Sequence, residues 1–256
     1  MQEPTGRRQF VRSVLGMGAA VVTPVAPGGE PDAPARPAEP AADAPRPCVF
    51  FTQLELEFVT AAVARLIPSD DLGPGAAEAG VPAFIDGQLA SAWGAHARNY
   101  RQGPWAEGTP QQGFQSPLSP RDIYRVAISG FEAHCLSAHG KRFNDLDGAT
   151  QDQLLRGLQN GAIPLSAVSG RLFFEMLWAN TQEGFFADPL YGGNRGKAGW
   201  QLIGYPGVAA TYIDWIERHG QPYRVAPVSV GDVISRAVQL DPHGHPLHEM
   251  LERKGE

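Results

Sequence analysis

The sequence predicts an all-α protein: a single irregular helical domain with long, ordered loops rich in Gly, Pro and aromatic residues. Apolar residues recur every three to four positions in several segments between residues 52 and 219, as they do on one face of a helix. The alternating pattern of a strand appears only weakly, at residues 223–230, where proline opposes it. The 30 Gly and 23 Pro among 256 residues indicate long irregular connections between the helices.

The first residues predict export from the cytoplasm. Residues 1–26 combine a basic start, a weakly apolar stretch at 14–25 that is too short to span a bilayer, and small residues. Arg7, Arg8 and Phe10 stand in the run RRQFVR, which is similar to the twin-arginine consensus for proteins exported in the folded state. We therefore expect a twin-arginine signal segment; a short amphipathic anchor or a chance arginine pair is the alternative.

The composition divides the rest of the chain into three parts. Residues 27–47 are rich in Pro and Ala, which favours an extended linker and excludes a helix. Residues 48–226 carry the helical periodicity and are expected to form the domain. Residues 227–256 are expected to form a C-terminal tail.

Cap residues and apolar spacing define the helices of the domain. Thr52 and Glu55 form a capping box, and Ser119 is an N-cap followed by proline at the first helical position. The segment 165–186 is apolar nearly all round, which predicts a central, buried helix. The expected helices are 52–67, 82–93, 119–140, 149–161, 165–186 and, shorter and amphipathic, 212–219.

Residues 94–118 have no periodicity and are expected to form a long loop. It carries the aromatic residues Tyr100, Trp105 and Phe114, which favour burial either against this domain or against a partner. Loops of this length in a compact domain are more often functional than not. We therefore regard the loop as a candidate contact surface.

The net charge and the cysteine content exclude several kinds of ligand and cross-link. The formal net charge of −6 argues against binding to nucleic acid or to anionic lipid. Two cysteines are too few for a disulfide scaffold, and their spacing fits no metal motif. If the chain is exported, Cys48 and Cys135 can form an intrachain bridge, pair with another chain, or remain free thiols.

The sequence has no motif for a cofactor or a metal. A C-x-x-C-H haem attachment motif is absent, and Gly192-Gly193-Asn194 follows a helix without the spacing of a dinucleotide-binding fingerprint. His243, His245 and His248 form the one histidine cluster, in a Pro- and Gly-rich segment expected to be a solvated tail. Metal binding by these histidines is the alternative. We assign no catalytic, cofactor-binding or metal-binding residue to this chain.

Residues 180–208 stand apart because they interleave glycines and aromatics with polar side chains. Glu183, Asp188, Asn194 and Arg195 could make up the acid–base site of a stand-alone periplasmic enzyme. The favoured interpretation is a hydrogen-bonded network that holds an irregular loop, or a surface that faces a partner. Together with the loop at 94–118, the candidate partner interface comprises Tyr100, Trp105, Phe114, Glu183, Phe185, Phe186, Asp188, Tyr191, Asn194, Arg195 and Trp200.

Three segments resemble the gluconate 2-dehydrogenase subunit 3 family. The most specific is ANTQEGFFADPLYGGNRGKAGWQLIGYPG at residues 179–207. The segments ARLIPSDDLGPGAAEAGVPAFIDGQLA at 64–90 and YRQGPWAEGTPQQGFQSPLSPRDIYR at 100–125 support it. The end of the chain, from about residue 227, shows no such resemblance.

The resemblance implies a non-catalytic small subunit of a membrane-associated, FAD-dependent dehydrogenase complex in the periplasm. Such subunits accompany a large flavoprotein that oxidises gluconate or a related sugar or polyol, and a multihaem cytochrome c that passes the electrons to quinone. FAD and haem c are then expected in the partner subunits and not in this chain. The small subunit is expected to supply the twin-arginine export signal and to stabilise the flavoprotein, in the manner of a chaperone, without a membrane span of its own.

Overall fold

The computed structural model describes residues 48–106, 108–113, 115–208, 212 and 215–251. The chain divides into a unit of residues 1–38, which lies outside the described residues, and a unit of residues 39–256, which contains everything below. The expected signal residues Arg7, Arg8 and Phe10 are therefore outside the described part of the chain.

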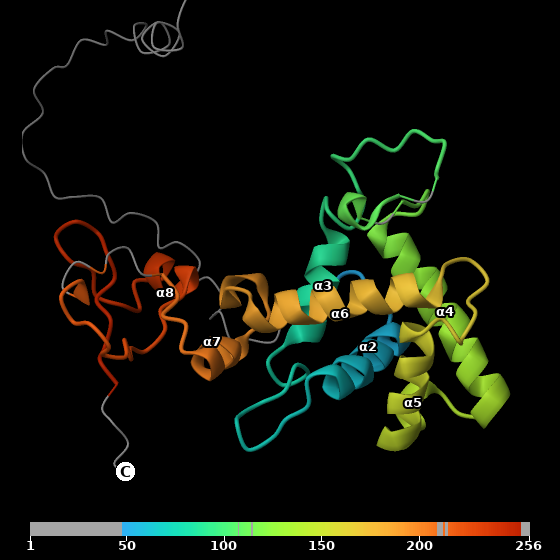
Figure 1. Cartoon of the computed structure of the whole chain (residues 1–256), viewed down its shortest axis with the longest axis horizontal. Helices are drawn as coiled ribbons and strands as arrows, with labels where there is room; N and C mark the ends of the chain where they lie inside the picture. Colours follow the sequence, from blue (N-terminus) through green and yellow to red (C-terminus); the bar gives the residue numbers. More distant parts are fainter. Residues whose placement is uncertain (1–47, 107, 114, 209–211, 213–214, 252–256) are drawn as a thin grey trace, which may run out of the picture. The chain divides into compact units, whose positions relative to one another are not determined.

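The described part of the chain contains α-helices and 3-10 turns and no strand, so the predicted fold class is confirmed (Figure 1). The α-helices are α2 (Gln53–Leu66), α3 (Val81–Ala90), α4 (Pro120–His139), α5 (Gly148–Gln159), α6 (Gly170–Phe186), α7 (Ala198–Ile203) and α8 (Val230–Ile234). The 3-10 turns are η1 (Pro110–Gln112), η2 (Phe143–Asp145), η3 (Pro189–Tyr191) and η4 (Arg195–Lys197).

Helix α6 lies at the centre of the helical core, as its apolar sequence predicts. It contacts α2, α3, α4, α5 and α7, and Figure 1 shows it crossing the other helices. Its Phe173 packs edge-on against Tyr124 of α4, with ring centroids 5.4 Å apart. Phe58 of α2 joins the same cluster, 5.2 Å from Phe143 and 5.7 Å from Phe131. All five rings are fully buried, so these aromatics anchor the helices to one another.

The two predicted N-terminal caps are present. The Thr52 hydroxyl accepts a hydrogen bond from the Glu55 N–H, and the Glu55 carboxylate accepts one from the Thr52 N–H at 2.8 Å. The Ser119 side chain caps α4 in the same way with Asp122, and Gly140 ends that helix with a positive φ of 67°. These local signals place the ends of α2 and α4 where the sequence predicts them.

Other boundaries differ from the prediction. Helix α3 ends at Ala90, three residues early, and α6 begins at Gly170, where Ser169 is the N-cap, instead of at residue 165. Among the described residues of 212–219, Trp215 is in a 3-10 conformation and the others form turns or irregular chain, so these residues do not form the predicted helix. Helices α7 and α8 were not predicted because each is short: six and five residues.

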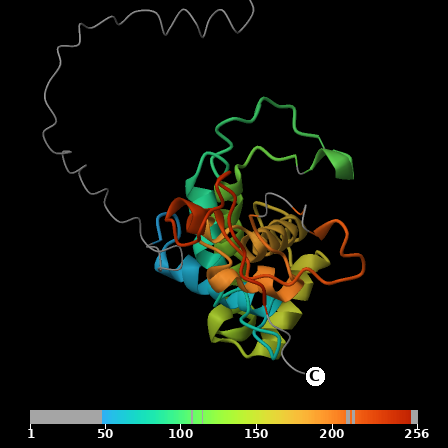
Figure 2. The same cartoon turned by 90° about the vertical axis from the view of Figure 1, so that its left-hand side faces the viewer.

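The loop at residues 94–118 is irregular apart from η1, as predicted. Figures 1 and 2 show it extending from the ends of α3 and α4 away from the helical core. Tyr100 is 83% exposed and Trp105 is 40% exposed, while Phe114 lies outside the described residues. Tyr100 is therefore largely exposed, and Trp105 is only partly covered by the described residues.

The cysteines are free thiols in the structure. Cys48 is exposed at the start of the described chain, whereas Cys135 is fully buried on α4. Burial raises the pKa of the Cys135 thiol to about 12, which suppresses its reactivity. The intrachain bridge is thus not formed here.

Candidate functional site

The unusual segment after α6, residues 187–208, is hereafter called the signature loop. Helix α6 ends at Phe186 with Ala187 as its C-cap, and two 3-10 turns, η3 and η4, lead into α7. Asn194 and Lys197 both have positive φ angles, 49° and 59°, which few residues other than glycine adopt. The loop therefore needs specific side chains to hold it.

Asn194 holds the two halves of the signature loop together. Its side chain is completely buried, and its Nδ2 donates to the Ala187 carbonyl at 2.8 Å. Its Oδ1 accepts the Gly199 N–H at 2.8 Å. Asn also tolerates the left-handed conformation better than most residues. Asn194 is thus a structural residue that joins the start of the loop to α7.

Two glycines allow the signature loop to approach α6 closely. A Cβ atom on Gly193 would lie 2.2 Å from the Gly184 carbonyl oxygen, and one on Gly199 would lie 2.2 Å from the Phe185 carbonyl oxygen. Both distances are far below van der Waals contact, so only glycine fits at these positions. Gly193 and Gly199 therefore allow close packing of the signature loop against α6.

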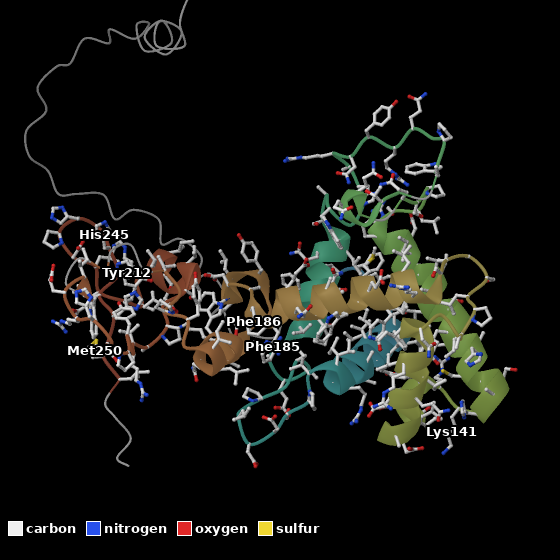
Figure 3. All side chains as sticks on the ribbon, viewed as in Figure 1. Lys141, Phe185, Phe186, Tyr212, His245 and Met250 are labelled. Carbon is white, nitrogen blue, oxygen red and sulfur yellow. The ribbon has the colours of Figure 1, made fainter. Side chains whose placement is uncertain are left out.

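The aromatics of the candidate interface divide into buried and exposed groups. Phe185 and Trp200 are 3% and 5% exposed, and the Trp200 indole N–H donates to the Phe186 carbonyl at 2.8 Å. Phe186 and Tyr191 are 38% and 57% exposed. Figure 3 places Phe185 and Phe186 together at the end of α6. The buried pair fixes the loop, and the exposed pair offers surface.

Asp188 connects the signature loop to α8 instead of acting as a free acid or base. Its Oδ1 accepts the Leu190 N–H at 2.9 Å and its Oδ2 accepts the Val230 N–H at 2.7 Å. Lys197 and Asp232 add an ion pair of 2.7 Å between η4 and α8. Because both oxygens of Asp188 are engaged with backbone groups, an acid–base role for this carboxylate is disfavoured.

Glu183 remains an exposed carboxylate on the last turns of α6. Partial burial raises its pKa above the ordinary value. The neighbouring polar group of α6, Asn180, is buried and donates to the Tyr124 hydroxyl at 3.1 Å.

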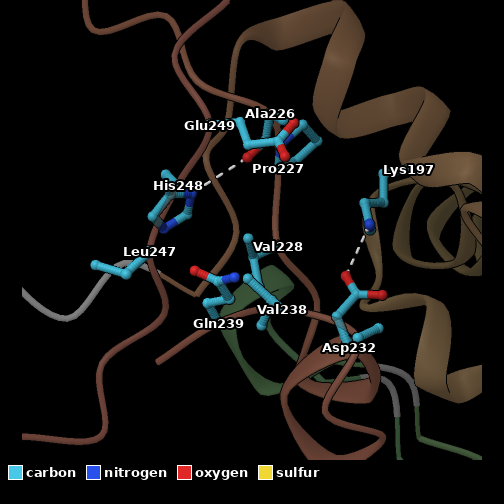
Figure 4. Close-up of a pocket in the computed structure, with 11 residues that line it drawn as sticks. Lys197, Ala226, Pro227, Val228, Asp232, Val238, Gln239, Leu247, His248 and Glu249 are labelled. Atoms are coloured by element: carbon cyan, nitrogen blue, oxygen red, sulfur yellow. Dashed lines mark hydrogen bonds and ion pairs between the residues drawn. The ribbon is translucent and has the colours of Figure 1, made fainter. Parts of the chain in front are cut away.

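A pocket of about 540 Å³ lies between the signature loop and the C-terminal segment (Figure 4). Its polar walls include Lys197, Asp232 and His248. Lys197 and Asp232 pair with each other, and the His248 ring nitrogens lie 3.2 Å from the Ala226 carbonyl and 2.9 Å from the Val208 carbonyl. The polar side chains of this pocket are thus mostly engaged within the protein.

The histidine cluster behaves differently from the expected solvated tail. His248 packs against the domain through the contacts just described, while the rings of His243 and His245 lie 6.2 Å apart. Across the described residues, no group of three or more His, Cys, Asp or Glu side chains is arranged to hold a metal ion. The three histidines therefore do not converge.

Sequence reasoning missed the contacts that fix the start of the domain. The Asp86 carboxylate of α3 is 2% exposed and accepts the N–H groups of Val49, Phe50 and Phe51 at 2.7, 3.0 and 2.7 Å. The Arg125 guanidinium donates to the Phe50 carbonyl at 2.6 Å and lies 4.2 Å from the centre of the Phe50 ring. The one charged residue in the apolar run VPAFIDGQLA could have indicated these contacts, because a buried carboxylate needs hydrogen-bond donors around it.

The protein is a small helical domain, and the polar and aromatic residues Asp188, Asn194 and Trp200 of its signature loop hydrogen-bond to backbone groups of the same chain. The family model of gluconate 2-dehydrogenase subunit 3 matches residues 53–207. This range covers more than half of the chain, from the start of α2 to just beyond α7. The chain therefore belongs to the gluconate 2-dehydrogenase subunit 3 family.

The other comparisons add no relative. Neither the curated proteins nor the solved structures gave a match to this chain. Within the described residues, every helix is too short or too polar to cross a membrane.

Proposed function

We propose that this chain is the non-catalytic small subunit of a membrane-associated, FAD-dependent gluconate 2-dehydrogenase-like complex. It supplies the twin-arginine export signal for a large flavoprotein and stabilises that flavoprotein. FAD and haem c belong to the partner subunits, and a multihaem cytochrome c completes the complex in the periplasm. The substrate class is gluconate or a related sugar or polyol.

The family match over residues 53–207 is the observation that carries the proposal. The local chemistry supports it. Asn194, Asp188 and Trp200, the polar and aromatic residues that distinguish the signature loop, bind backbone groups of this chain. Residues engaged in this way favour a structural role for the loop over a catalytic one.

The proposed route also explains why a chain without a cofactor motif carries a folded-cargo signal. FAD binds a folded flavoprotein, so a flavoprotein that acquires FAD in the cytoplasm must be exported folded. A bound partner that carries RRQFVR supplies that route for both chains.

Co-expression tests the proposal. The candidate flavoprotein partner is expressed with and without this chain, and dehydrogenase activity and flavin absorbance are measured in periplasmic and cytoplasmic fractions. We expect periplasmic, flavin-containing activity that co-purifies with the tagged chain, and low cytoplasmic activity when the chain is omitted. Normal export of the flavoprotein in its absence would contradict the proposal.

The purified chain provides the complementary measurement. As a subunit without catalytic residues, it should show no turnover of sugars or sugar acids alone. Turnover that is lost in Glu183→Gln would instead identify a stand-alone periplasmic enzyme, because Glu183 is the exposed carboxylate with a raised pKa beside the signature loop.

A further inference from the structure

The His248 ring hydrogen-bonds to two separate backbone segments. Its Nε2 lies 2.9 Å from the carbonyl oxygen of Val208, the last residue of the signature loop. Its Nδ1 lies 3.2 Å from the carbonyl oxygen of Ala226 (Figure 4). These partners are 40 and 22 residues away in the chain, so one side chain joins three distant segments.

The two contacts of His248 depend on how many protons its ring carries. A carbonyl oxygen only accepts hydrogen bonds, so each contact needs a proton on the ring nitrogen. A neutral imidazole has one N–H, and it would place the lone pair of its other nitrogen against an oxygen. The imidazolium has a proton on both nitrogens. The observed geometry is therefore complete only when His248 is positively charged.

The two carbonyl groups rely on this ring for a donor. Among the described residues, no backbone N–H donates to the carbonyl of Val208 or of Ala226. The N–H groups of the same two residues are bound elsewhere, to the Val228 carbonyl at 2.8 Å and to the Glu249 carbonyl at 2.9 Å. Loss of one ring proton thus leaves a carbonyl of a partly buried residue without its donor, which weakens the arrangement.

Residues 247–251, hereafter the strap, lie along residues 224–228. The Leu251 N–H donates to the Arg224 carbonyl at 3.1 Å, and Met250 forms an isolated antiparallel bridge with Val225. The three apolar side chains of the strap are each more than half exposed. Hydrogen bonds therefore contribute a large part of what holds the strap in place, and His248 makes two of them.

The charged groups that line the pocket with His248 are Lys197 of η4, Asp232 of α8 and Glu249 of the strap. Lys197 and Asp232 pair at 2.7 Å and offset each other. Glu249 takes part in none of the ion pairs formed among the described residues. The charge left over in this pocket is therefore negative, which is compatible with an imidazolium there.

Other ionisable groups lie in the segments next to the strap. Arg224 is exposed, and residues 206–208 carry no ionisable side chain. His245 forms an ion pair with Asp241, with Nδ1 and Oδ2 3.2 Å apart, when its ring is protonated. Because this pair also responds to mild acid, an experiment has to separate it from His248.

We propose that His248 is a proton-dependent latch that fastens the strap to the end of the signature loop and to residues 224–228. Protonation completes the closed arrangement, and loss of the proton breaks one of its two ring hydrogen bonds. Acidification therefore favours the closed strap, and rising pH favours its release. All the atoms of the latch belong to this chain, so the inference does not depend on the proposed function.

Hydrogen exchange of the whole purified chain tests the latch. The N–H groups of Ala226 and Leu251 report closure, because each is bonded between the strap and residues 224–228. After correction for the intrinsic pH dependence of exchange, their protection should be about tenfold or more higher at about pH 5.5 than at about pH 8. In His248→Gln, whose side chain does not titrate, their protection should be the same at both pH values. Equal protection at both pH values in the wild type would overturn the proposal.

Two other histidines serve as matched controls. His219 is exposed and takes part in none of the ion pairs among the described residues, so His219→Gln should keep the wild-type pH dependence. His245→Gln should also keep it, because His245 and Asp241 both lie outside the strap. A pH dependence that is lost in His245→Gln and kept in His248→Gln would assign the effect to the other histidine and overturn the latch.

Nuclear magnetic resonance of the unchanged chain decides the matter if His248→Gln does not fold. At about pH 5.5, both ring N–H groups of His248 should give cross peaks, because both are hydrogen-bonded and exchange slowly with water. The ring N–H groups of the exposed His219 should be lost to fast exchange. Two protected ring N–H groups in His248 support the latch, and one or none overturns it.

Discussion

At the junction between the linker and the domain, three consecutive backbone N–H groups converge on the carboxylate of Asp86. Asp86→Asn replaces one acceptor oxygen by a donor that faces other donors. We expect a loss of about 2 kcal/mol or more in the free energy of unfolding, because hydrogen bonds to buried charged groups contribute about 1.5–3 kcal/mol. Urea denaturation of the purified chain measures it.

The control for this prediction is Asp152→Asn. Asp152 also accepts hydrogen bonds, but from Arg65 at the surface, with Asp152 Oδ1 2.7 Å from Arg65 Nε. Surface pairs contribute about 0–1 kcal/mol, so the control should change stability little. If Asp86→Asn lowers the free energy of unfolding as little as the control does, the Asp86 contacts are not important for stability.

The second prediction for a single residue concerns the stability that the Asn194 side chain contributes. Asn194→Ala leaves the Ala187 carbonyl and the Gly199 N–H without their partner and places Ala at a φ of 49°. We expect a loss of about 3 kcal/mol, from two buried hydrogen bonds and about 1 kcal/mol of backbone strain. Asn194→Gly removes the strain and should be about 1 kcal/mol less destabilising than Asn194→Ala. Urea denaturation of both variants decides; an unchanged midpoint in Asn194→Ala would contradict this role.

Individual residues were harder to place from sequence than helices. The polar residues of the signature loop were recognised as unusual, but the sequence left open whether they form a network, a catalytic site or a partner surface. Asp86 was missed because its partners lie 35 to 37 residues away in the chain. Contacts at such separation depend on how α3 packs and leave no local pattern.

The stability that the N-terminal cap of α4 contributes depends on pH. The Ser119 hydroxyl donates to the Asp122 carboxylate and holds the pKa of Asp122 below its ordinary value, against the opposing effect of burial. A lowered folded-state pKa contributes stability above the unfolded-state value, near 4, and this contribution is lost as pH falls through the folded-state pKa.

Asp122→Asn should therefore destabilise the chain at pH 7 by about 0.5–2 kcal/mol, the range for a lost helix cap. The difference from the wild type should shrink at pH 3, because the wild-type carboxylate is then losing its charge. Urea denaturation at both pH values measures this. A difference that stays constant or grows toward pH 3 would contradict the cap's dependence on charge.

The close approach of the signature loop to α6 gives a prediction with an internal control. Gly193→Ala places a Cβ atom 2.2 Å from the Gly184 carbonyl oxygen and should destabilise the chain by about 2 kcal/mol or more. Gly87→Ala, inside α3 with no atom within 4 Å of the new Cβ, should stabilise it by about 0.5–1 kcal/mol. Thermal melting compares the two, and equal shifts would contradict the packing described here.

Helices with local start signals were predicted, and those without them were not. The capping boxes at Thr52 and Ser119 act within four residues, so sequence reasoning located α2 and α4. The N-cap of helix α7 is Lys197, which has a left-handed backbone conformation and makes no side-chain cap hydrogen bond, so the sequence carries no cap signal for this helix. Ser229 and Asp232 form a capping box that could have located α8. At residues 212–219, helical spacing alone predicted a helix that the described residues do not form.

For the whole molecule, the sequence predicted the all-α class and the family, because both depend on patterns spread over many residues. The family match runs over residues 53–207 and so includes the core helices and the signature loop. Tyr100, Trp105, Phe186 and Tyr191 are exposed in the chain by itself, so their side chains are available for contact with a partner. Such surfaces fit a subunit that is completed by a partner, which is the proposed function.

The most direct test of this account is the location of dehydrogenase activity when the export signal is changed. Arg7 and Arg8 are replaced together by Lys in cells that express both chains, and Arg36→Lys with Arg46→Lys in the linker is the control. We predict that the flavoprotein's activity and this chain both remain in the cytoplasm with the first change and reach the periplasm with the control. Periplasmic flavoprotein activity in spite of the Lys-Lys replacement would contradict the claim that this chain exports its partner.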